Sequence, residues 1–175
     1  MSLIDPTEKQ YLQIKTWFNS HQEIYTWGGP KMTYPMSDEN FLNLLKAPHL
    51  NSFCLMNESF INNNLIKGSL QNANQEIVAF GQYYKRLGRH HLCRLAVSPD
   101  FRGQGFSKSL ITQLLEQAAK IHPNTDASLF VFKGNIVAYN CYKSLGFVET
   151  KYPEALFPSN MQSCVYMVFS ASPQN

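Results

Sequence analysis

The stretch Leu95-Ala96-Val97-Ser98-Pro99-Asp100-Phe101-Arg102-Gly103-Gln104-Gly105-Phe106-Ser107 decides the fold of this chain. Its apolar start predicts a strand that ends before Pro99, and the helical spacing of apolar residues from Leu110 to Ala118 predicts a helix over about 105–121. The two glycines between them expose backbone N–H groups and tolerate positive φ. Because a helix start adds partial positive charge, this loop can bind a phosphate or pyrophosphate.

Two common phosphate-binding motifs do not fit this loop. A P-loop needs Gly-x-x-x-x-Gly-Lys-Ser/Thr, but Arg102 and Ser107 occupy the two glycine positions before Lys108-Ser109. A dinucleotide fingerprint needs Gly-x-Gly-x-x-Gly, and Lys108 occupies its third glycine position. A nucleotide-binding domain is therefore disfavoured.

Two segments resemble a known family. Leu-x-Val-x-Pro at 95–99, followed by Arg-x-x-Gly-x-Ser at 102–107, resembles the acyl-CoA loop of the GNAT N-acetyltransferases, which usually have Gly or Ala where Ser107 stands. Residues 135–147 resemble the family's later motif, Asn-x-x-Ala-x-x-x-Tyr-x-x-x-Gly-Phe. The resemblance implies an α/β (α+β) GNAT fold with a mixed, mostly antiparallel central sheet of about six to seven strands and about four flanking helices.

Composition agrees with one globular domain over residues 1–175. The chain is 44% hydrophobic and 15% charged, enough to bury a full core. No apolar run could span a bilayer, and residues 1–10 lack the pattern of a secretion signal, so we expect a cytoplasmic protein with no membrane partner. The net charge of +3 is dispersed, which argues against nucleic acid as a partner.

The cysteines and the basic residues suggest no further site. The cysteines, Cys54, Cys93, Cys141 and Cys164, form no Cys-x-x-Cys pair, so neither a disulfide framework nor a metal site is expected. The densest basic cluster consists of Lys85, Arg86, Arg89 and Arg94. We interpret it as a solvated hairpin, with contact to cofactor phosphates as the alternative.

The remaining pattern predicts early helices followed by an alternation of strands and helices. Helices are expected from Thr7 through Phe18, over 21–25, from Ser37 to Pro48 and over 136–145; strands are expected at 3–4, 52–56, 77–84, 90–97, 128–132, 147–150 and 163–169. Part of the polar run 57–74 is expected to form a further strand, with a turn at 72–74.

The resemblance implies where acetyl-CoA binds. In the family it lies where two central strands splay apart, and its pantetheine arm pairs with strand backbone, here Leu95-Ala96-Val97. The pyrophosphate would then bind at the loop and helix start, made of Arg102, Gly103, Gln104, Gly105, Phe106, Ser107 and Lys108. Asn135 would hydrogen-bond the cofactor, although an Asn at that place is also a common helix N-cap.

The resemblance also implies catalytic roles. Tyr142 matches the family's proton donor to the CoA sulfur, with a core tyrosine as the alternative. His91 lies six residues before Val97, where family members carry a glutamate or histidine base, and a histidine titrating near neutrality would suit that role. Strand alternation predicts that His91, Cys93, Leu95 and Val97 share one face and that His90 lies on the other.

The acceptor side is the least defined. The early helices and loops would supply it through Tyr25, Trp27 and Tyr34, with Glu23, Asp38 or Glu39 attracting a cationic amine; packing of a long loop is the alternative. Enzymes resembling the ribosomal-protein alanine acetyltransferase carry a glutamate five residues before the Asn, where this chain has Phe130. That difference argues against their mechanism.

These observations predict an enzyme, an N-acetyltransferase that transfers acetyl from acetyl-CoA to a primary amine of a small molecule or peptide in a ternary complex. The chain would act as a monomer or homodimer. Cys93 and Cys141 leave a covalent route through an acyl-cysteine open. The alternative from another class is a non-catalytic module that binds acyl-CoA.

Overall fold

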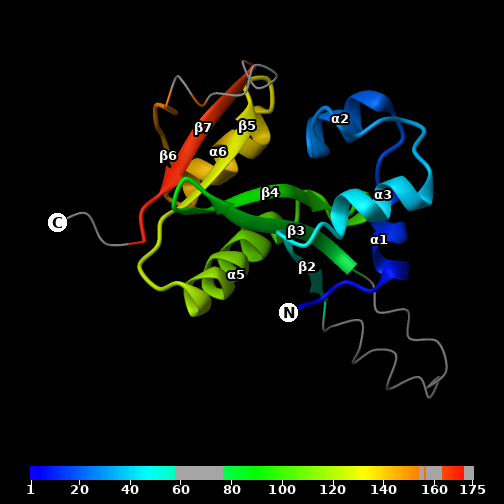
Figure 1. Cartoon of the computed structure of the whole chain (residues 1–175), viewed down its shortest axis with the longest axis horizontal. Coiled ribbons are helices and arrows are strands. Elements are labelled where there is room, and N and C mark those ends of the chain that lie inside the picture. Colours follow the sequence, from blue (N-terminus) through cyan, green and yellow to red (C-terminus); the bar gives the residue numbers. More distant parts are fainter. Residues whose placement is uncertain (58–76, 154–155, 157–162, 172–175) are drawn as a thin grey trace.

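A single mixed sheet forms the centre of the computed structural model, which describes residues 1–57, 77–153, 156 and 163–171 (Figure 1). Its seven strands lie in the order β1 (Ser2–Ile4), β2 (Asn51–Met56), β3 (Ile77–Arg86), β4 (Arg89–Val97), β5 (Ala127–Phe132), β7 (Cys164–Phe169) and β6 (Val148–Glu149). Only the neighbours β4 and β5 run parallel. The expected mostly antiparallel sheet is confirmed, while the strand and turn expected within 57–74 lie outside the described residues beyond Asn57.

Five α-helices flank the sheet in the described part of the chain, one more than the approximate number expected. They are α1 (Glu8–Lys15), α2 (His21–Gly28), α3 (Asp38–Leu45), α5 (Phe106–Ile121) and α6 (Ile136–Ser144), and a 3₁₀ turn spans Pro99–Phe101. Local side chains fix where the early helices begin: Thr7 caps α1 in a reciprocal pair with Gln10, and Ser20 and Ser37 cap α2 and α3.

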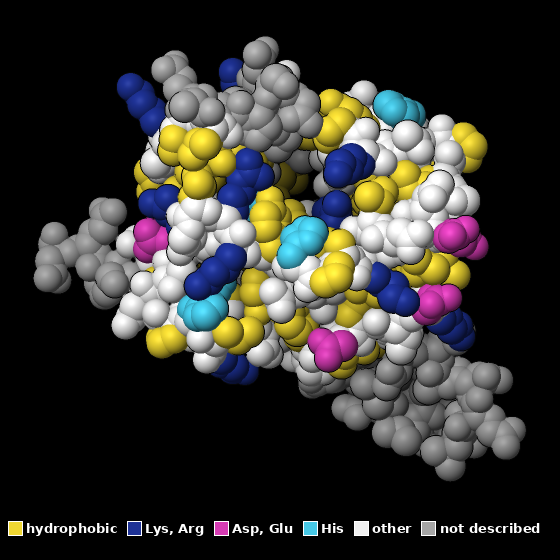
Figure 2. Space-filling view, viewed as in Figure 1, with side chains coloured by type: hydrophobic (Ala, Val, Ile, Leu, Met, Phe, Trp, Pro, Cys, Tyr) yellow, Lys and Arg dark blue, Asp and Glu magenta, His cyan; other side chains and the backbone are white. Residues whose placement is uncertain are grey.

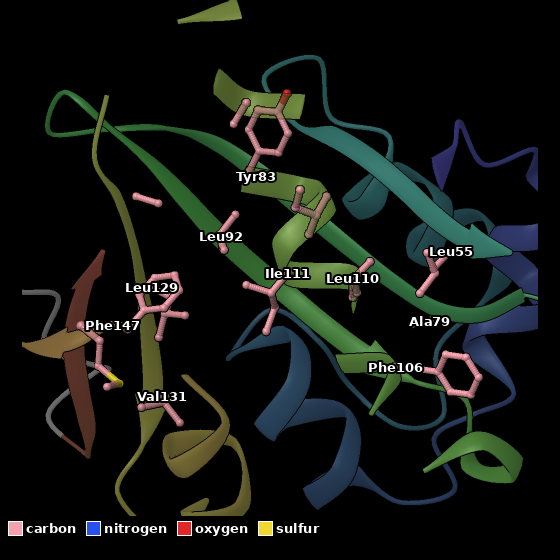
Figure 3. Packing of buried hydrophobic residues seen from close by; sticks show 14 of the residues in the cluster. Leu55, Ala79, Tyr83, Leu92, Phe106, Leu110, Ile111, Leu129, Val131 and Phe147 are labelled. Carbon is pink, nitrogen blue, oxygen red and sulfur yellow. The ribbon is translucent and has the colours of Figure 1, made fainter. Parts of the chain in front are cut away.

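The helices cover both faces of the sheet. The leucine-rich face of α5 packs with β3, β4 and β5 in one hydrophobic cluster, and residues of α6 pack against the same cluster (Figure 3). A second cluster joins α1, α2 and α3 to the opposite side of β2 and β3. Strand β3 contributes to both clusters: Val78 and Ala79 belong to the first, and Ile77 and Phe80 belong to the second.

A β-bulge interrupts β4 opposite Gly81. Phe80 pairs with Ala96 and Gln82 pairs with Cys93, so two residues of β4 lie opposite one residue of β3. One of them, Arg94, has φ of 50°, which is unusual for a residue other than glycine. A Cβ on Gly81 would come within 2.7 Å of the Leu114 side chain and 2.8 Å of the Leu95 side chain. The glycine therefore leaves room for these two side chains, from α5 and β4, to pack against β3.

The bulge reverses the facing of the last part of β4. Leu95 and Val97 pack with the α5 cluster, as Leu92 does, whereas Ala96 packs with the α1–α3 cluster. The prediction that His91, Cys93, Leu95 and Val97 share one face is therefore wrong, because strict alternation holds only for a strand without an inserted residue.

Candidate functional site

The parallel strands β4 and β5 separate in the middle of the sheet. They pair only from His90 to Leu92, opposite Ala127 to Leu129. Beyond this point β5 pairs only with β7, and residues from both strands line a cavity of about 840 Å³. Residues of α2 and of α5 also line this central cavity, so it reaches both faces of the sheet.

Figure 2 shows a hollow between the α2 region and the lobe of β5, β7 and β6. Lys and Arg side chains gather on its rim, and the Asp and Glu side chains visible on this face lie away from it.

Most of the expected cofactor residues meet in the central cavity. The lining includes Leu95, Ala96, Val97, Arg102, Gly103, Ser107, Asn135 and Tyr142. Gln104, Gly105, Phe106 and Lys108 are absent from the lining, although they belong to the same loop and helix start.

The glycine loop has the backbone geometry of an anion-binding helix start. Gly103 and Gly105 have φ of 76° and 84°, and Gly105 is the N-cap of α5. An added Cβ would meet nothing within 4 Å at either position, so backbone conformation and not space requires glycine here. No side chain caps α5, which leaves the first N–H groups of the helix available to a ligand.

Phe106 and Ser107 hold this helix start in place. The Phe106 side chain is 8% exposed and packs edge-on against Phe101, so it anchors α5 in the core. The Ser107 Oγ lies 3.5 Å from the Cys141 Sγ on α6, which brings the two motif segments into direct contact. The small side chain of Ser107 permits that approach.

Tyr142 faces the cavity from α6. Burial raises the pKa of its phenol well above the ordinary value, so the hydroxyl is protonated at neutral pH and can act as a donor. Its ring packs against Phe147, with centroids 6.1 Å apart. Tyr142 thus packs in the core and lines the cavity, and its role as proton donor stays a prediction.

Asn135 is the N-cap of α6. Its Oδ1 accepts a hydrogen bond from the Ala138 N–H at 3.2 Å. The capping bond uses the oxygen, so the amide nitrogen remains a donor at the edge of the cavity that Asn135 lines.

His91 is buried at the end of the cavity away from the glycine loop. It is 3% exposed, and its Nδ1 lies 3.0 Å from the Ser128 Oγ. Burial, and then the charge of Arg86, lowers its pKa to about 3. The expected titration near neutrality is thus not met, and the imidazole is neutral at physiological pH. His90 faces the other way and stacks on His122, as alternation predicted.

Of the three expected acceptor residues, only Trp27 lines the cavity. It stacks on Phe18 at 4.4 Å, and its Nε1 is buried without a hydrogen-bond partner in the described part of the structure. Tyr25 and Tyr34 are absent from the lining; Tyr34 is 47% exposed. The sequence shows that all three residues are aromatic, but it does not show which of them lies in the cavity and which on the surface.

Sequence reasoning missed the group around Arg86, which we call the Arg86 cluster: Arg86 with Tyr84, His91, Phe130 and Tyr152. The guanidinium donates from Nε to the Tyr152 hydroxyl at 2.9 Å and from Nη1 to the Tyr84 hydroxyl at 3.0 Å. Its Cζ also lies 5.3 Å from the Phe130 ring centroid. The alternation of Tyr84 and Arg86 in a strand was a signal that both face one side.

The basic hairpin is thus not uniformly solvated. Arg86 and Arg94 line the cavity, Lys85 is exposed, and Arg89 lies 3.7 Å from an Asp126 carboxylate oxygen. The alternative interpretation, contact with cofactor phosphates, stays a prediction, and only Arg86 and Arg94 of the four lie at the cavity.

One further observation concerns the Cys93 thiol. Burial raises the pKa of the Cys93 thiol to about 11, so it is a poor nucleophile at neutral pH.

No group of three or more His, Cys, Asp or Glu among the described residues is placed to hold a metal ion. Within the same residues, no helix is long and apolar enough to cross a membrane.

Comparison with known proteins agrees with this geometry. The ribosomal-protein-S18-alanine N-acetyltransferase from Escherichia coli has a similar fold, with a TM-score of 0.64 at 19% identity over 99% of this chain and 96% of that one. The spermidine N-acetyltransferase from Vibrio cholerae, solved with CoA and spermine, gives a TM-score of 0.68 at 16% identity over 97% of this chain and 95% of that one. The model of the acetyltransferase (GNAT) family matches residues 17–147. The chain belongs to the acetyltransferase (GNAT) family.

Proposed function

We propose that this chain is a single-domain N-acetyltransferase that moves acetyl from acetyl-CoA to a primary amine by direct attack in a ternary complex. One observation carries the proposal: the split between β4 and β5 opens into a cavity that holds both the glycine loop and Tyr142. Acetyl-CoA would supply the acetyl group as an activated thioester. The amine acceptor can belong to a small molecule or a peptide.

The cofactor would lie on the α5 and α6 side of the split. The free N–H groups at the start of α5 and the Arg102 guanidinium suit a pyrophosphate. From Leu95 to Val97, β4 runs beside β3 but does not pair with β5, so its free edge offers backbone groups to an extended arm, while the Leu95 and Val97 side chains pack in the core. The two uses do not compete, since one involves backbone and the other side chains.

Tyr142 would protonate the departing thiolate. Its raised pKa keeps the proton on the hydroxyl until sulfur carries developing charge. His91 would accept a hydrogen bond from the incoming neutral amine through the nitrogen that does not face Ser128. With its pKa at about 3, His91 is too weak a base to remove a proton from an ammonium group, so we assign to it a positioning role. As the C–N bond forms and the C–S bond breaks, the proton that the nitrogen loses would return to Tyr142, which has given its own proton to the thiolate.

Two measurements test this function. Acetyl-CoA should raise the melting temperature, whereas ATP and NAD should not, because only a ligand that binds the folded state stabilises it. A panel of amines with acetyl-CoA should then release free thiol in proportion to acetylated product. Binding of acetyl-CoA without acetylation of any amine would favour the non-catalytic module instead.

A further inference from the structure

We infer that the cavity selects amine acceptors that also carry a carboxylate, and that Arg86 is the residue that recognises it. This inference rests on the proposed function, because it names the substrate class of the same cavity. It starts from the charges that line the cavity: Arg86, Arg94 and Arg102 against one carboxylate, Glu23.

The single carboxylate is already engaged. The Glu23 Oε2 accepts a hydrogen bond from the backbone N–H of Asn19 at 2.7 Å, at the start of α2. It therefore serves the helix end, and the excess positive charge in the cavity has no internal counterpart among the described residues. A cationic chain such as a polyamine would be repelled, and an anionic group would be attracted.

The three arginines have different tasks. Arg94 donates to the Gln82 Oε1 at 2.8 Å and more weakly to the Leu44 carbonyl, so it ties the bulge to neighbouring elements. Arg102 lies at the glycine loop, on the cofactor side. Arg86 lies beside His91 on the opposite side of the cavity, so it is the cation nearest to where an acceptor would enter.

The Arg86 cluster is built to present a donor surface. Its hydrogen bonds to Tyr152 and Tyr84 use Nε and one Nη1 hydrogen, which leaves three of the five guanidinium N–H bonds for a ligand. Tyr84 accepts from Arg86, so its own hydroxyl hydrogen is available to an acceptor on the ligand. The planar Arg86 guanidinium is held by aromatic rings and by two tyrosine hydroxyls. Its parallel N–H groups, with the Tyr84 hydroxyl beside them, match the two oxygens of a carboxylate.

The experiment compares acids with their own amides. Glycine, β-alanine, γ-aminobutyrate and ε-aminocaproate are each assayed against the corresponding amide, with spermidine as the cationic probe. The four acids differ in the number of carbons between the amine and the carboxylate, so the series covers a range of distances between the two groups. Because an amide lowers the pKa of a nearby amine and so raises its neutral fraction, a preference for the acid cannot come from amine ionisation.

The wild-type chain should show kcat/KM at least tenfold higher for one or more acids than for the matched amide, mainly through KM. Arg86→Gln should bring that ratio close to one, and Arg86→Lys should retain part of it. Lys85→Gln removes the same charge from the exposed neighbour and should leave the ratio unchanged. Equal use of acid and amide by the wild type, or a ratio that Arg86→Gln does not alter, would overturn the inference.

A binding measurement separates this inference from the proposed function. With CoA present, at least one of the four acids should raise the melting temperature of the wild type but not of Arg86→Gln, and the matched amide should raise neither. If no amine is acetylated, the proposed function fails, and this binding result alone decides whether Arg86 recognises a carboxylate. Absence of the acid-dependent shift in the wild type counts against the inference even where turnover is seen.

Discussion

The side chains of Gln82 and Arg94 are hydrogen-bonded to each other, and Gln82 also bonds to α3 and β2. Its Oε1 accepts from Arg94 Nη1 at 2.8 Å, and its Nε2 donates to the Leu45 carbonyl at 2.8 Å and to the Ser52 hydroxyl at 2.7 Å. Gln82 is fully buried, so these bonds are formed out of contact with water. They connect the β4 bulge to the end of α3 and thus fix one side of the split that forms the cavity.

Gln82→Leu should lower the free energy of unfolding by about 1–3 kcal/mol, because it removes an acceptor from Arg94 and leaves the buried Leu45 carbonyl with only the long 3.5 Å hydrogen bond from the Ser52 hydroxyl. Urea denaturation measures the change. Gln113→Leu is the control, since Gln113 bonds only within its own helix, to Ser109, and the expected change is within about 0.5 kcal/mol. Equal effects of the two substitutions would show that the Gln82 network adds little.

The positions of most elements were predictable from the sequence, but the facing of β4 was not. Apolar periodicity and capping residues such as Thr7 and Ser37 are local signals, and they placed the helices and strands correctly. The bulge carries no such signal, because Arg94 takes its positive φ through bonds to distant Gln82 and Leu44. In the same way, the sequence around Arg86 is that of an exposed residue, and only tertiary contacts place its side chain against the rings of Phe130 and Tyr152.

Gly105→Ala should weaken acetyl-CoA binding and lower stability by about 1–2 kcal/mol, because a Cβ is disfavoured at φ of 84°. Calorimetric titration and urea denaturation measure the two effects. Gly134→Ala is the matched control: its Cβ would also meet nothing within 4 Å, and its φ lies outside the left-handed region. Similar behaviour of both variants would contradict a special role for the loop conformation.

Tyr142→Phe should reduce kcat about 100-fold, the scale of a lost general acid, while the affinity for acetyl-CoA changes little. Steady-state kinetics and calorimetry separate the two quantities. Tyr139→Phe provides the comparison on the same helix, since the Tyr139 hydroxyl bonds to exposed Glu149 at 3.4 Å and is absent from the cavity lining. Unchanged turnover in Tyr142→Phe would remove the proposed proton transfer.

His91 should make the protein sensitive to acid. The pKa of His91 is about 3 in the folded chain, and its ordinary value of 6.5 applies to the unfolded chain. Between these two values the unfolded state binds a proton at His91 and the folded state does not. Stability is therefore complete above pH 6.5 and falls as the pH drops towards 3, by about 1.4 kcal/mol for each pH unit.

His91→Gln removes the titrating group while it keeps a partner for Ser128, so the dependence of unfolding free energy on pH should flatten between pH 6.5 and 4. The same variant tests the positioning role in catalysis. Because His91 is neutral throughout the range from pH 6 to 9, its loss should lower kcat without changing the shape of the pH–rate profile. A profile that loses its acidic limb in the variant would instead mark His91 as the group that takes the ammonium proton, and would place its pKa in the working complex close to neutrality.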